Sequence, residues 1–333
     1  MFQLNARRHP PFASASLSLL LAFGFAAHAQ QAEPVKTGVT TPGVQRKMTE
    51  VRPIATFKVA GNPDWMAVTT DSVWVVSSRA NLVTRLDANT NQPADTISVS
   101  KPCSGLVFAF NSLWIPSCGA HKLVRADAVS GKVLAEIAAG PADSEGGIAA
   151  GAGSIWLVTE KGGVLTRIDA KTNSIAANIA IPSGSFNPLF ADGFVWVSSN
   201  QNNVLIKLDA ATNQIAATIP VGKNPRFLTA GAGSVWTLNQ GDGTITRVDT
   251  KTGRKVATID AGVPGPGGEI AFGFGSVWAT MMEFPITRVD ASANKVIRQW
   301  SGEGGDSIRT GLGSVWLTSL KTGVVWRISP DQL

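Results

Sequence analysis

Residues able to do chemistry recur at one position of a repeat in this 333-residue chain. Seven tryptophans stand 38 to 42 residues apart, and polar or aromatic residues lie nine to eleven positions before each of them. Carboxylates, guanidiniums and aromatic rings at equivalent places of successive repeats predict one shared polar pocket. The set consists of Asp64, Trp65, Cys103, Ser104, Glu145, Phe186, Asn187, Arg226, Phe227, Glu269 and Asp306, with Arg309 slightly further along the last repeat.

This set has two interpretations. In the first, Trp65 or Phe227 forms an apolar wall, and Arg226 or Arg309 grips the carboxylate or phosphate of a small anionic ligand or a partner's peptide. Asp64, Asn187 and Asp306 then complete the ligand-binding residues. In the second, the charged groups neutralise one another as ion pairs that plug a central channel.

If the pocket is catalytic, its acid and base are expected to be carboxylates. His121 is the only histidine after residue 28, and tyrosine is absent, which argues against a Ser-His-Asp triad. Glu145 and Glu269 are the first candidates, because crowding among like charges raises a carboxyl pKa. Asp64, Glu145, Glu269 and Asp306 could together hold Ca²⁺ or Mg²⁺. No D-x-D loop spacing supports such a site, so no cofactor is firmly implied and no metal ligand is assigned.

The tryptophan period indicates what positions these residues. A period of about 40 residues with several short strands is typical of a β-propeller blade. The repeats read GAGSIWLV, DGFVWVSS, GAGSVWTL, GFGSVWAT and GLGSVWLT. The glycines lie between two strands and open no helix, which predicts hairpin turns and not a phosphate-binding loop. The seven tryptophans are Trp74, Trp114, Trp156, Trp196, Trp236, Trp278 and Trp316.

One unit shows how a blade should fold. Within residues 226–263, strands are expected at 227–230, 235–238, 244–248 and 255–260, named a to d from the axis outward. The stretch 53–59 has the pattern of strand d but precedes the first unit, and the last unit ends after strand c. We therefore predict an all-β, seven-bladed propeller of four antiparallel strands per blade, in which the N-terminal strand completes the last blade.

The connections predict where function lies. The a–b and c–d turns repeat almost unchanged, whereas the d–a connections differ in every unit, for example GNPDW, GPADSEGG and GKNPRF. Antiparallel order puts the d–a and b–c connections on one face. That face, around the central channel, is expected to carry the site.

The first 29 residues are expected to be a signal peptide. Arg7 and Arg8 precede a short apolar stretch, and Ala27-His28-Ala29 is a small-x-small cleavage motif. Residues 30–50 are expected to form a flexible leader, and residues 51–333 the propeller. No stretch is long and apolar enough for a membrane span. This organisation predicts a periplasmic protein that meets a small molecule, a peptide or a periplasmic protein partner.

Charge and cysteine content narrow the class further. After residue 29, 27 Lys and Arg face 23 Asp and Glu, a net charge of +4 without a basic run. Nucleic-acid binding is therefore not expected. Cys103 and Cys118 are the only cysteines, and export favours a disulfide between them. Two free thiols, or a redox or metal pair without CxxC spacing, are the alternatives.

The repeats resemble a known group. The pattern G-x-G-S-V-W-V…V-x-R-I-D-x-x-T-N-x-I-x-A-T-I-x-V-G-x-x-P, closest at residues 213–222, is similar to YVTN-type and virginiamycin B lyase-like propeller repeats over residues 54–329. That resemblance implies the propeller fold. It also implies, as an alternative to ligand binding, a lyase or a lactone or ester hydrolase assisted by a metal. The lyase uses histidine with glutamate on one face; Glu145 and Glu269 match the glutamates, and no histidine matches.

Overall fold

The structure is a computed structural model that describes residues 1, 37–103, 105–142, 145 and 147–333. Residues 2–29 of the expected signal peptide lie outside the described residues. The described residues from 37 onward belong to one compact unit.

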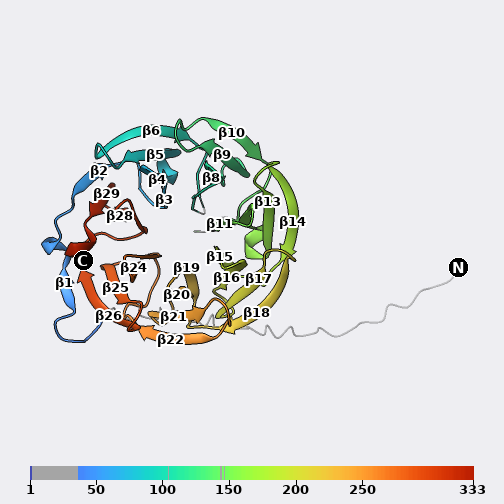
Figure 1. The fold of residues 1–333 in the computed structure, drawn as a ribbon. Helices are drawn as coiled ribbons and strands as arrows, with labels where there is room; N and C mark the ends of the chain where they lie inside the picture. Colours follow the sequence, from blue (N-terminus) through green and yellow to red (C-terminus); the bar gives the residue numbers. More distant parts are fainter. Residues whose placement is uncertain (2–36, 104, 143–144, 146) are drawn as a thin grey trace. The chain divides into compact units, whose positions relative to one another are not determined.

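Seven antiparallel sheets are arranged in a ring around a central axis (Figure 1), which confirms the predicted seven-bladed, all-β propeller. Strand a lies nearest the axis in every blade. Blades one to three are β3 (Met66–Val68), β4 (Ser72–Ser77), β5 (Leu82–Asp87), β6 (Gln92–Ser98); β7 (Val107–Ala109), β8 (Ser112–Ser117), β9 (Lys122–Asp127), β10 (Val133–Ile137); and β11 (Ile148–Gly151), β12 (Ser154–Thr159), β13 (Val164–Asp169), β14 (Ser174–Ala180).

The remaining blades follow the same order. Blades four to six are β15 (Ser185–Ala191), β16 (Phe194–Ser199), β17 (Val204–Asp209), β18 (Gln214–Pro220); β19 (Pro225–Gly231), β20 (Ser234–Asn239), β21 (Thr244–Asp249), β22 (Lys255–Asp260); and β23 (Ile270–Gly273), β24 (Ser276–Met281), β25 (Phe284–Asp290), β26 (Lys295–Ser301). Blade seven contains β27 (Ile308–Gly311), β28 (Ser314–Ser319) and β29 (Val324–Ile328). Short 3-10 turns are η1 (Met48–Glu50), η2 (Ser78–Ala80), η3 (Glu160–Gly162) and η4 (Pro330–Gln332).

The ring is closed by the N-terminal strand, as predicted. Strand β2 (Ala55–Lys58) pairs antiparallel with β29, with Ala55 opposite Arg327. Blade seven is therefore built from both ends of the propeller, and its outer strand leads directly into blade one. This closure fixes blade one against blade seven, which matters for the site below.

A further strand was not predicted. Strand β1 (Gln45–Lys47) pairs parallel with β26, with Gln45 opposite Gln299, so part of the stretch expected to be a flexible leader joins the outer edge of blade six. Gln299 also accepts a hydrogen bond from the backbone N–H of Val39 at 2.8 Å. Outer strands carry unpaired backbone groups that a passing chain can satisfy. Three residues give too short a pattern to reveal such pairing in advance.

The repeated tryptophans form the contacts between blades. All seven indole side chains are fully buried. In blade five, the guanidinium of Arg247 lies 4.8 Å over the ring of Trp236, while its Nη1 donates at 2.7 Å to the carbonyl of Ala291 in blade six. Arg125, Arg167 and Arg327 make the same contacts, and Arg327 thereby joins blade seven to blade one. In these four blades the arginine on strand c therefore bonds to the next blade, whereas Arg85 of blade one pairs with Asp71 and Asp95 of its own blade.

The turns that repeat within the chain, a–b and c–d, lie on the face opposite the d–a connections. At the a–b turn of blade five, Ala232 and Gly233 both have positive φ, 51° and 65°, the backbone that a two-residue hairpin requires. At the c–d turn, the carboxylate of Asp249 accepts hydrogen bonds from the backbone and hydroxyl of Thr252. The a–b and c–d turns have the same backbone conformation in most blades. The d–a and b–c connections on the opposite face differ from blade to blade.

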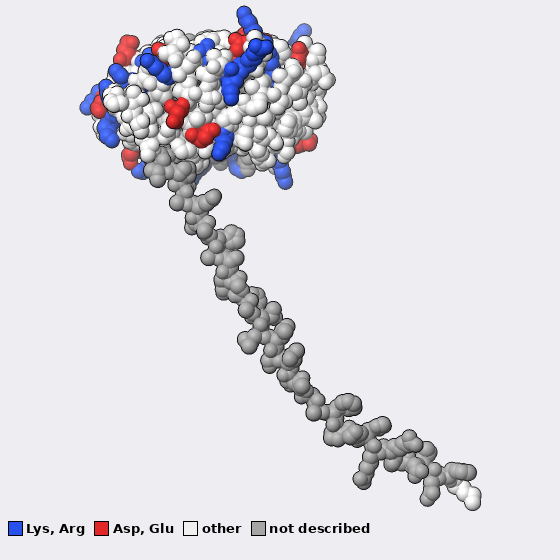
Figure 2. Space-filling model, turned by 90° about the horizontal axis from the view of Figure 1, so that it is seen from below, with Lys and Arg blue, Asp and Glu red and all other residues white. Residues whose placement is uncertain are grey.

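No helix among the described residues is long and apolar enough to cross a membrane. On the side of the propeller seen in Figure 2, basic and acidic side chains of the described residues are interspersed.

Candidate functional site

The d–a connections and b–c turns enclose a cavity of about 340 Å³ at one end of the channel, here named the mouth pocket. Strand a of each blade begins at this end, so the polar set predicted from the sequence is brought to it. The lining residues include Asp64, Trp65, Ser78, Lys101, Cys103, Glu145, Phe186 and Arg226.

The acidic side of the mouth pocket is a pair of carboxyl groups. Asp64 of blade one is hydrogen-bonded through its side chain to Asp306 of blade seven. Burial, together with the negative charges of Asp306, Glu145 and Glu269, raises the pKa of Asp64 well above its usual range. Burial also raises the pKa of Asp306, against the lowering effect of hydrogen bonds from Asp64 and the backbone of Gly268. The protonated form of Asp64, beside Asp306, is therefore favoured.

The basic side of the pocket is an ion pair. Arg226 Nη2 lies 2.9 Å from Glu145 Oε2, and the two side chains are 23% and 53% exposed. The guanidinium lies 4.3 Å over the ring of Phe186 and 5.4 Å over that of Phe227, and its Nε has no hydrogen-bond partner among the described residues. Burial raises the pKa of Glu145, although Arg226 lowers it. Because Glu145 is half exposed, water screens this pair.

A second ion pair lies deeper. Glu269 is almost fully buried and pairs with Nη1 of Arg309. Its other carboxylate oxygen accepts hydrogen bonds from the Ser307 hydroxyl and, at 3.2 Å, from the backbone of Ile308. Burial raises the pKa of Glu269, and Arg309 and these donors lower it. The carboxylate is fully engaged in binding blade seven.

Asn187 has the same structural position as Glu269. Both residues lie nine positions before the tryptophan of their blade. The Asn187 side-chain oxygen accepts a hydrogen bond from the backbone of Leu228 in blade five at 2.8 Å, as Glu269 does from Ile308 in blade seven. Both side chains therefore tie one inner strand to the next.

An aromatic layer divides the predicted pocket in two. The rings of Trp65 and Phe227 meet edge to face at 5.4 Å, and Phe227 and Phe186 meet at 6.2 Å. Trp65 is 6% exposed and Phe227 1%. Trp65 lines the mouth pocket and also a second cavity of about 390 Å³, the channel cavity, which Asn187, Glu269 and Arg309 line. The structure thus gathers the predicted residues around the axis, but on two levels.

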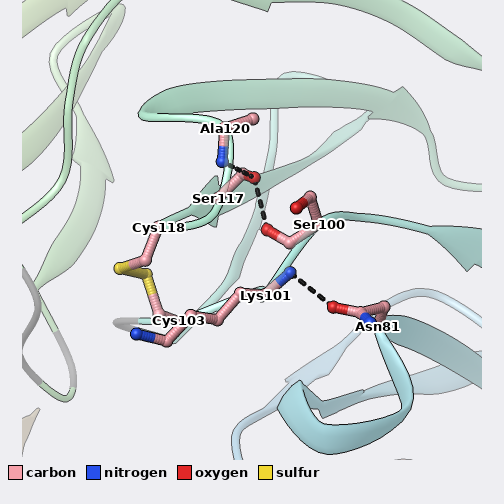
Figure 3. The surroundings of a disulfide bond; sticks show 7 residues. All are labelled: Asn81, Ser100, Lys101, Cys103, Ser117, Cys118 and Ala120. Atoms are coloured by element: carbon pink, nitrogen blue, oxygen red, sulfur yellow. Dashed lines mark hydrogen bonds between the residues drawn. A yellow bond between two sulfur atoms is a disulfide. The ribbon is translucent and has the colours of Figure 1, made fainter.

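The predicted disulfide forms the rim of the mouth pocket (Figure 3). Cys103 and Cys118 are bonded, with Cα atoms 5.8 Å apart. The bond joins the connection before β7 to the end of β8. Beside it, the Ser117 hydroxyl donates to the carbonyl of Ser100 at 2.6 Å, and the backbone of Lys101 donates to Asn81 Oδ1 at 2.7 Å. These contacts fix the d–a connection that carries Lys101 and Cys103 to the pocket.

Other sequence expectations have less support in the geometry. Among the described residues, no three His, Cys, Asp or Glu side chains are grouped so that they could hold a metal ion. The described residues therefore offer no such group for the Ca²⁺ or Mg²⁺ considered from the sequence. His121 lies on the b–c turn after Cys118 and does not line the mouth pocket. Ser104 lies outside the described residues.

A family model described as "Domain of unknown function (DUF5074)" matches residues 56–304. The chain belongs to the DUF5074 family. This match covers most of the propeller, from the closing strand β2 to the connection after β26. No curated protein sequence matches the chain.

Two solved structures have the same fold as this DUF5074 protein. A streptogramin B lyase has a TM-score of 0.68 and 21% sequence identity, covering 81% of this chain and 95% of the lyase. A catalytically inactive virginiamycin B lyase from Staphylococcus aureus, solved with quinupristin, has a TM-score of 0.68 and 19% identity, covering 82% and 98%. The chain therefore has a virginiamycin B lyase-like β-propeller fold.

Four residues that line the mouth pocket were not predicted from the sequence: Val76, Ser78, Lys101 and Pro102. Of these, Lys101 belongs to a d–a connection and Ser78 to a b–c turn. Lys101 is two positions before Cys103, so the polar composition of that connection was an available signal. Ser78 follows Trp74, whereas the predicted set was taken from residues nine to eleven positions before each tryptophan.

Proposed function

We propose that this propeller is a binding protein whose mouth pocket takes a short peptide or another small ligand that carries both a carboxylate and an amino group. The observation that carries the proposal is that Asp64, whose carboxyl group is paired with that of Asp306, lines one cavity with the Arg226–Glu145 ion pair. Groups of both signs, lined by aromatic side chains, are what a zwitterionic ligand needs.

The carboxylate of such a ligand would bind Arg226. The present partner of Arg226 is half exposed and lies in a d–a connection, so a ligand carboxylate can replace Glu145 without leaving a buried charge unpaired. A guanidinium binds a carboxylate through two parallel hydrogen bonds, and the rings of Phe186 and Phe227 already fix its plane. Arg309 is a poorer candidate, because its partner Glu269 is buried and held by two further donors.

The amino group of the ligand would bind the acidic pair. Asp64 and Glu145 line the mouth pocket together with Arg226 and Lys101, and Asp306 adds a third carboxyl group beside Asp64, so the acidic side offers a place for a positive charge. An ammonium group placed at Asp64 and Asp306 can replace the proton that the raised pKa of Asp64 favours there, because it supplies three donors and a positive charge. The sequence-based expectation of an anionic ligand is thereby narrowed to one that also carries a cation.

A matched set of dipeptides tests the proposal. Ala-Phe, its N-acetyl form and its C-terminal amide differ only in the two end charges, and a wider dipeptide panel covers side-chain preference. We expect free dipeptides to raise the Tm and both blocked forms to bind at least about tenfold more weakly, since a lost charged hydrogen bond costs about 1.5–3 kcal/mol. Arg226→Gln should lower the affinity for free dipeptides to that of the wild-type protein for the amide form. If no dipeptide binds at millimolar concentration, or blocked forms bind equally well, the proposal fails.

A second candidate function is acid/base catalysis on a lactone or ester, by a lyase or hydrolase. The observation that favours it is the raised pKa of Asp64, since a carboxyl group that stays protonated near neutral pH can act as a general acid. Glu145, which lines the same cavity, is the better placed of the two glutamates expected to be catalytic; Glu269 is engaged with blade seven. Turnover of a chromogenic lactone or ester that Asp64→Asn abolishes would support this function.

We also propose that the protein acts outside the cytoplasm, in the periplasm. The signal-peptide pattern of residues 1–29 and the disulfide between Cys103 and Cys118 support this location. Cell fractionation with an N-terminal sequence of the mature protein tests it: we expect a periplasmic protein that begins at Gln30.

A further inference from the structure

We infer that the channel cavity is a second binding site, for a small uncharged apolar molecule with one carbonyl group. The cavity lies on the other side of the aromatic layer from the mouth pocket and has a volume of about 390 Å³, within the range of roughly 300–1,000 Å³ usual for small-molecule sites. It shares Trp65 with the mouth pocket, but the inference does not rest on the proposed peptide site.

One repeated position supplies mostly small or apolar side chains to the wall of this cavity. The residue seven positions before each tryptophan lines it in all seven blades. Six of these seven residues are small or apolar, among them Ala149 and Thr229, and the seventh is Arg309. At the opposite end of the channel from the mouth pocket, Phe110 and Phe274 lie in a–b turns and are 42% and 44% exposed. An apolar molecule entering from that side would leave water along its whole path.

Two side chains with N–H donors, Trp65 and Arg309, line this cavity. Trp65 is more than nine-tenths buried, and its indole N–H has no hydrogen-bond partner among the described residues. The guanidinium of Arg309 lies 5.5 Å over the same indole ring. Within the described part of the chain, Arg309 makes its polar contacts through Nη1, to Glu269 and to the carbonyl of Ile308. An unsatisfied buried donor costs free energy, and a ligand acceptor can recover it.

The charge balance selects an uncharged acceptor. Glu269 pairs with Arg309, so the attraction of a ligand carboxylate to the guanidinium would be offset by its repulsion from the glutamate. Asp64 and Asp306 add further negative charge from beyond the aromatic layer. A ketone or amide oxygen can accept a hydrogen bond from the indole or the guanidinium without that repulsion. The apolar part of the ligand would then contact the small and apolar side chains of the wall.

Three small molecules of similar shape test the assignment: acetophenone, ethylbenzene, which lacks the acceptor, and benzoate, which is charged. Affinities are measured by ligand-observed NMR with the full-length mature protein. We expect acetophenone to bind about tenfold more tightly than either other compound, as one hydrogen bond of about 1.4 kcal/mol would give. Trp65→Phe should reduce that preference while keeping an aromatic ring in the layer.

Two variants test the place of binding. Thr229→Leu and Ala149→Leu each fill the channel from one wall, and each should weaken acetophenone at least about tenfold with a cooperative melting transition retained. Arg226→Gln, which alters the mouth pocket only, should leave acetophenone affinity unchanged and so separates this inference from the proposed peptide site. The inference is overturned if acetophenone does not bind at millimolar concentration, if ethylbenzene or benzoate binds as tightly, or if neither folded Leu variant weakens it.

Discussion

The carboxyl group of Asp64, in the first blade, is hydrogen-bonded to that of Asp306, in the last blade. The two residues are far apart in sequence and meet because β2 closes the ring against β29. The closure of the propeller therefore also assembles its acidic pair. Loss of the closing strand should affect the mouth pocket as well as stability.

The raised pKa of Asp64 makes stability depend on pH. Asp64 has a folded-state pKa above its unfolded value of about 3.9, so its contribution to stability is fully present below that value and is lost as the pH rises through the raised pKa. Asp64→Asn keeps a hydrogen-bond donor without the charge. We expect the variant to melt above the wild type at pH 7, by about 2 °C for each kcal/mol of relieved repulsion, and the difference to shrink toward pH 4.

An exposed aspartate provides a control of opposite sign. Hydrogen bonds from the backbone and hydroxyl of Thr252 lower the pKa of Asp249, so its contribution is present at neutral pH and is lost as the pH falls through the lowered value. Asp249→Ala should therefore melt below the wild type at pH 7, and the gap should close in acid. A parallel pH trend for Asp64→Asn and Asp249→Ala would contradict the raised pKa of Asp64.

The disulfide should stabilise the propeller and its pocket together. Cys103 and Cys118 are 15 residues apart, and closing a loop of that size contributes about 3 kcal/mol in the chain-entropy description. We expect Cys103→Ala with Cys118→Ala to lower the free energy of unfolding by about that amount in urea denaturation. The native protein should contain no titratable thiol; two reactive thiols before reduction would disprove the bond.

The interblade arginine at the closure should matter more than a surface ion pair. Arg327 bonds to the Ala88 carbonyl and, at 2.8 Å, to Asn91 of blade one, so Arg327→Gln should cost about 1.5–3 kcal/mol in urea denaturation. Lys321→Gln removes a pair with Glu303 whose side chains are 79% and 69% exposed, and should cost under about 1 kcal/mol. Equal effects of the two substitutions would show that Arg327 does not hold blade seven to blade one.

Removal of divalent metal should leave the propeller unchanged. Among the described residues no three potential ligands are grouped for a cation, and the carboxyl groups at the channel are occupied by each other and by arginines. We expect dialysis against EDTA to change neither the Tm nor dipeptide affinity, measured beside a sample with added Ca²⁺ or Mg²⁺. A fall in Tm with EDTA that Ca²⁺ reverses would establish the cation that the carboxylate count first suggested.

The sequence predicted the fold because each repeat carries the same packing residues, so Trp236 and Gly233 identify a blade without knowledge of its neighbours. It also predicted which residues converge, because strand a begins at a fixed distance from the tryptophan. It could not assign their roles. Glu145 and Glu269 differ by two positions in that register, yet one is half exposed beside Arg226 and the other is buried against blade seven. Side-chain direction and interblade partners, such as Ile308 for Glu269, depend on packing between sheets.

Proton release on binding tests the central claim most directly. Titration calorimetry of the tightest dipeptide at pH 7, in two buffers with different ionisation enthalpies, counts the protons exchanged. If the ligand's ammonium replaces the proton that the raised pKa of Asp64 favours beside Asp306, about one proton should leave for each dipeptide bound, and none with Asp64→Asn. Binding without proton release in the wild-type protein, or equal release in both proteins, would contradict the account.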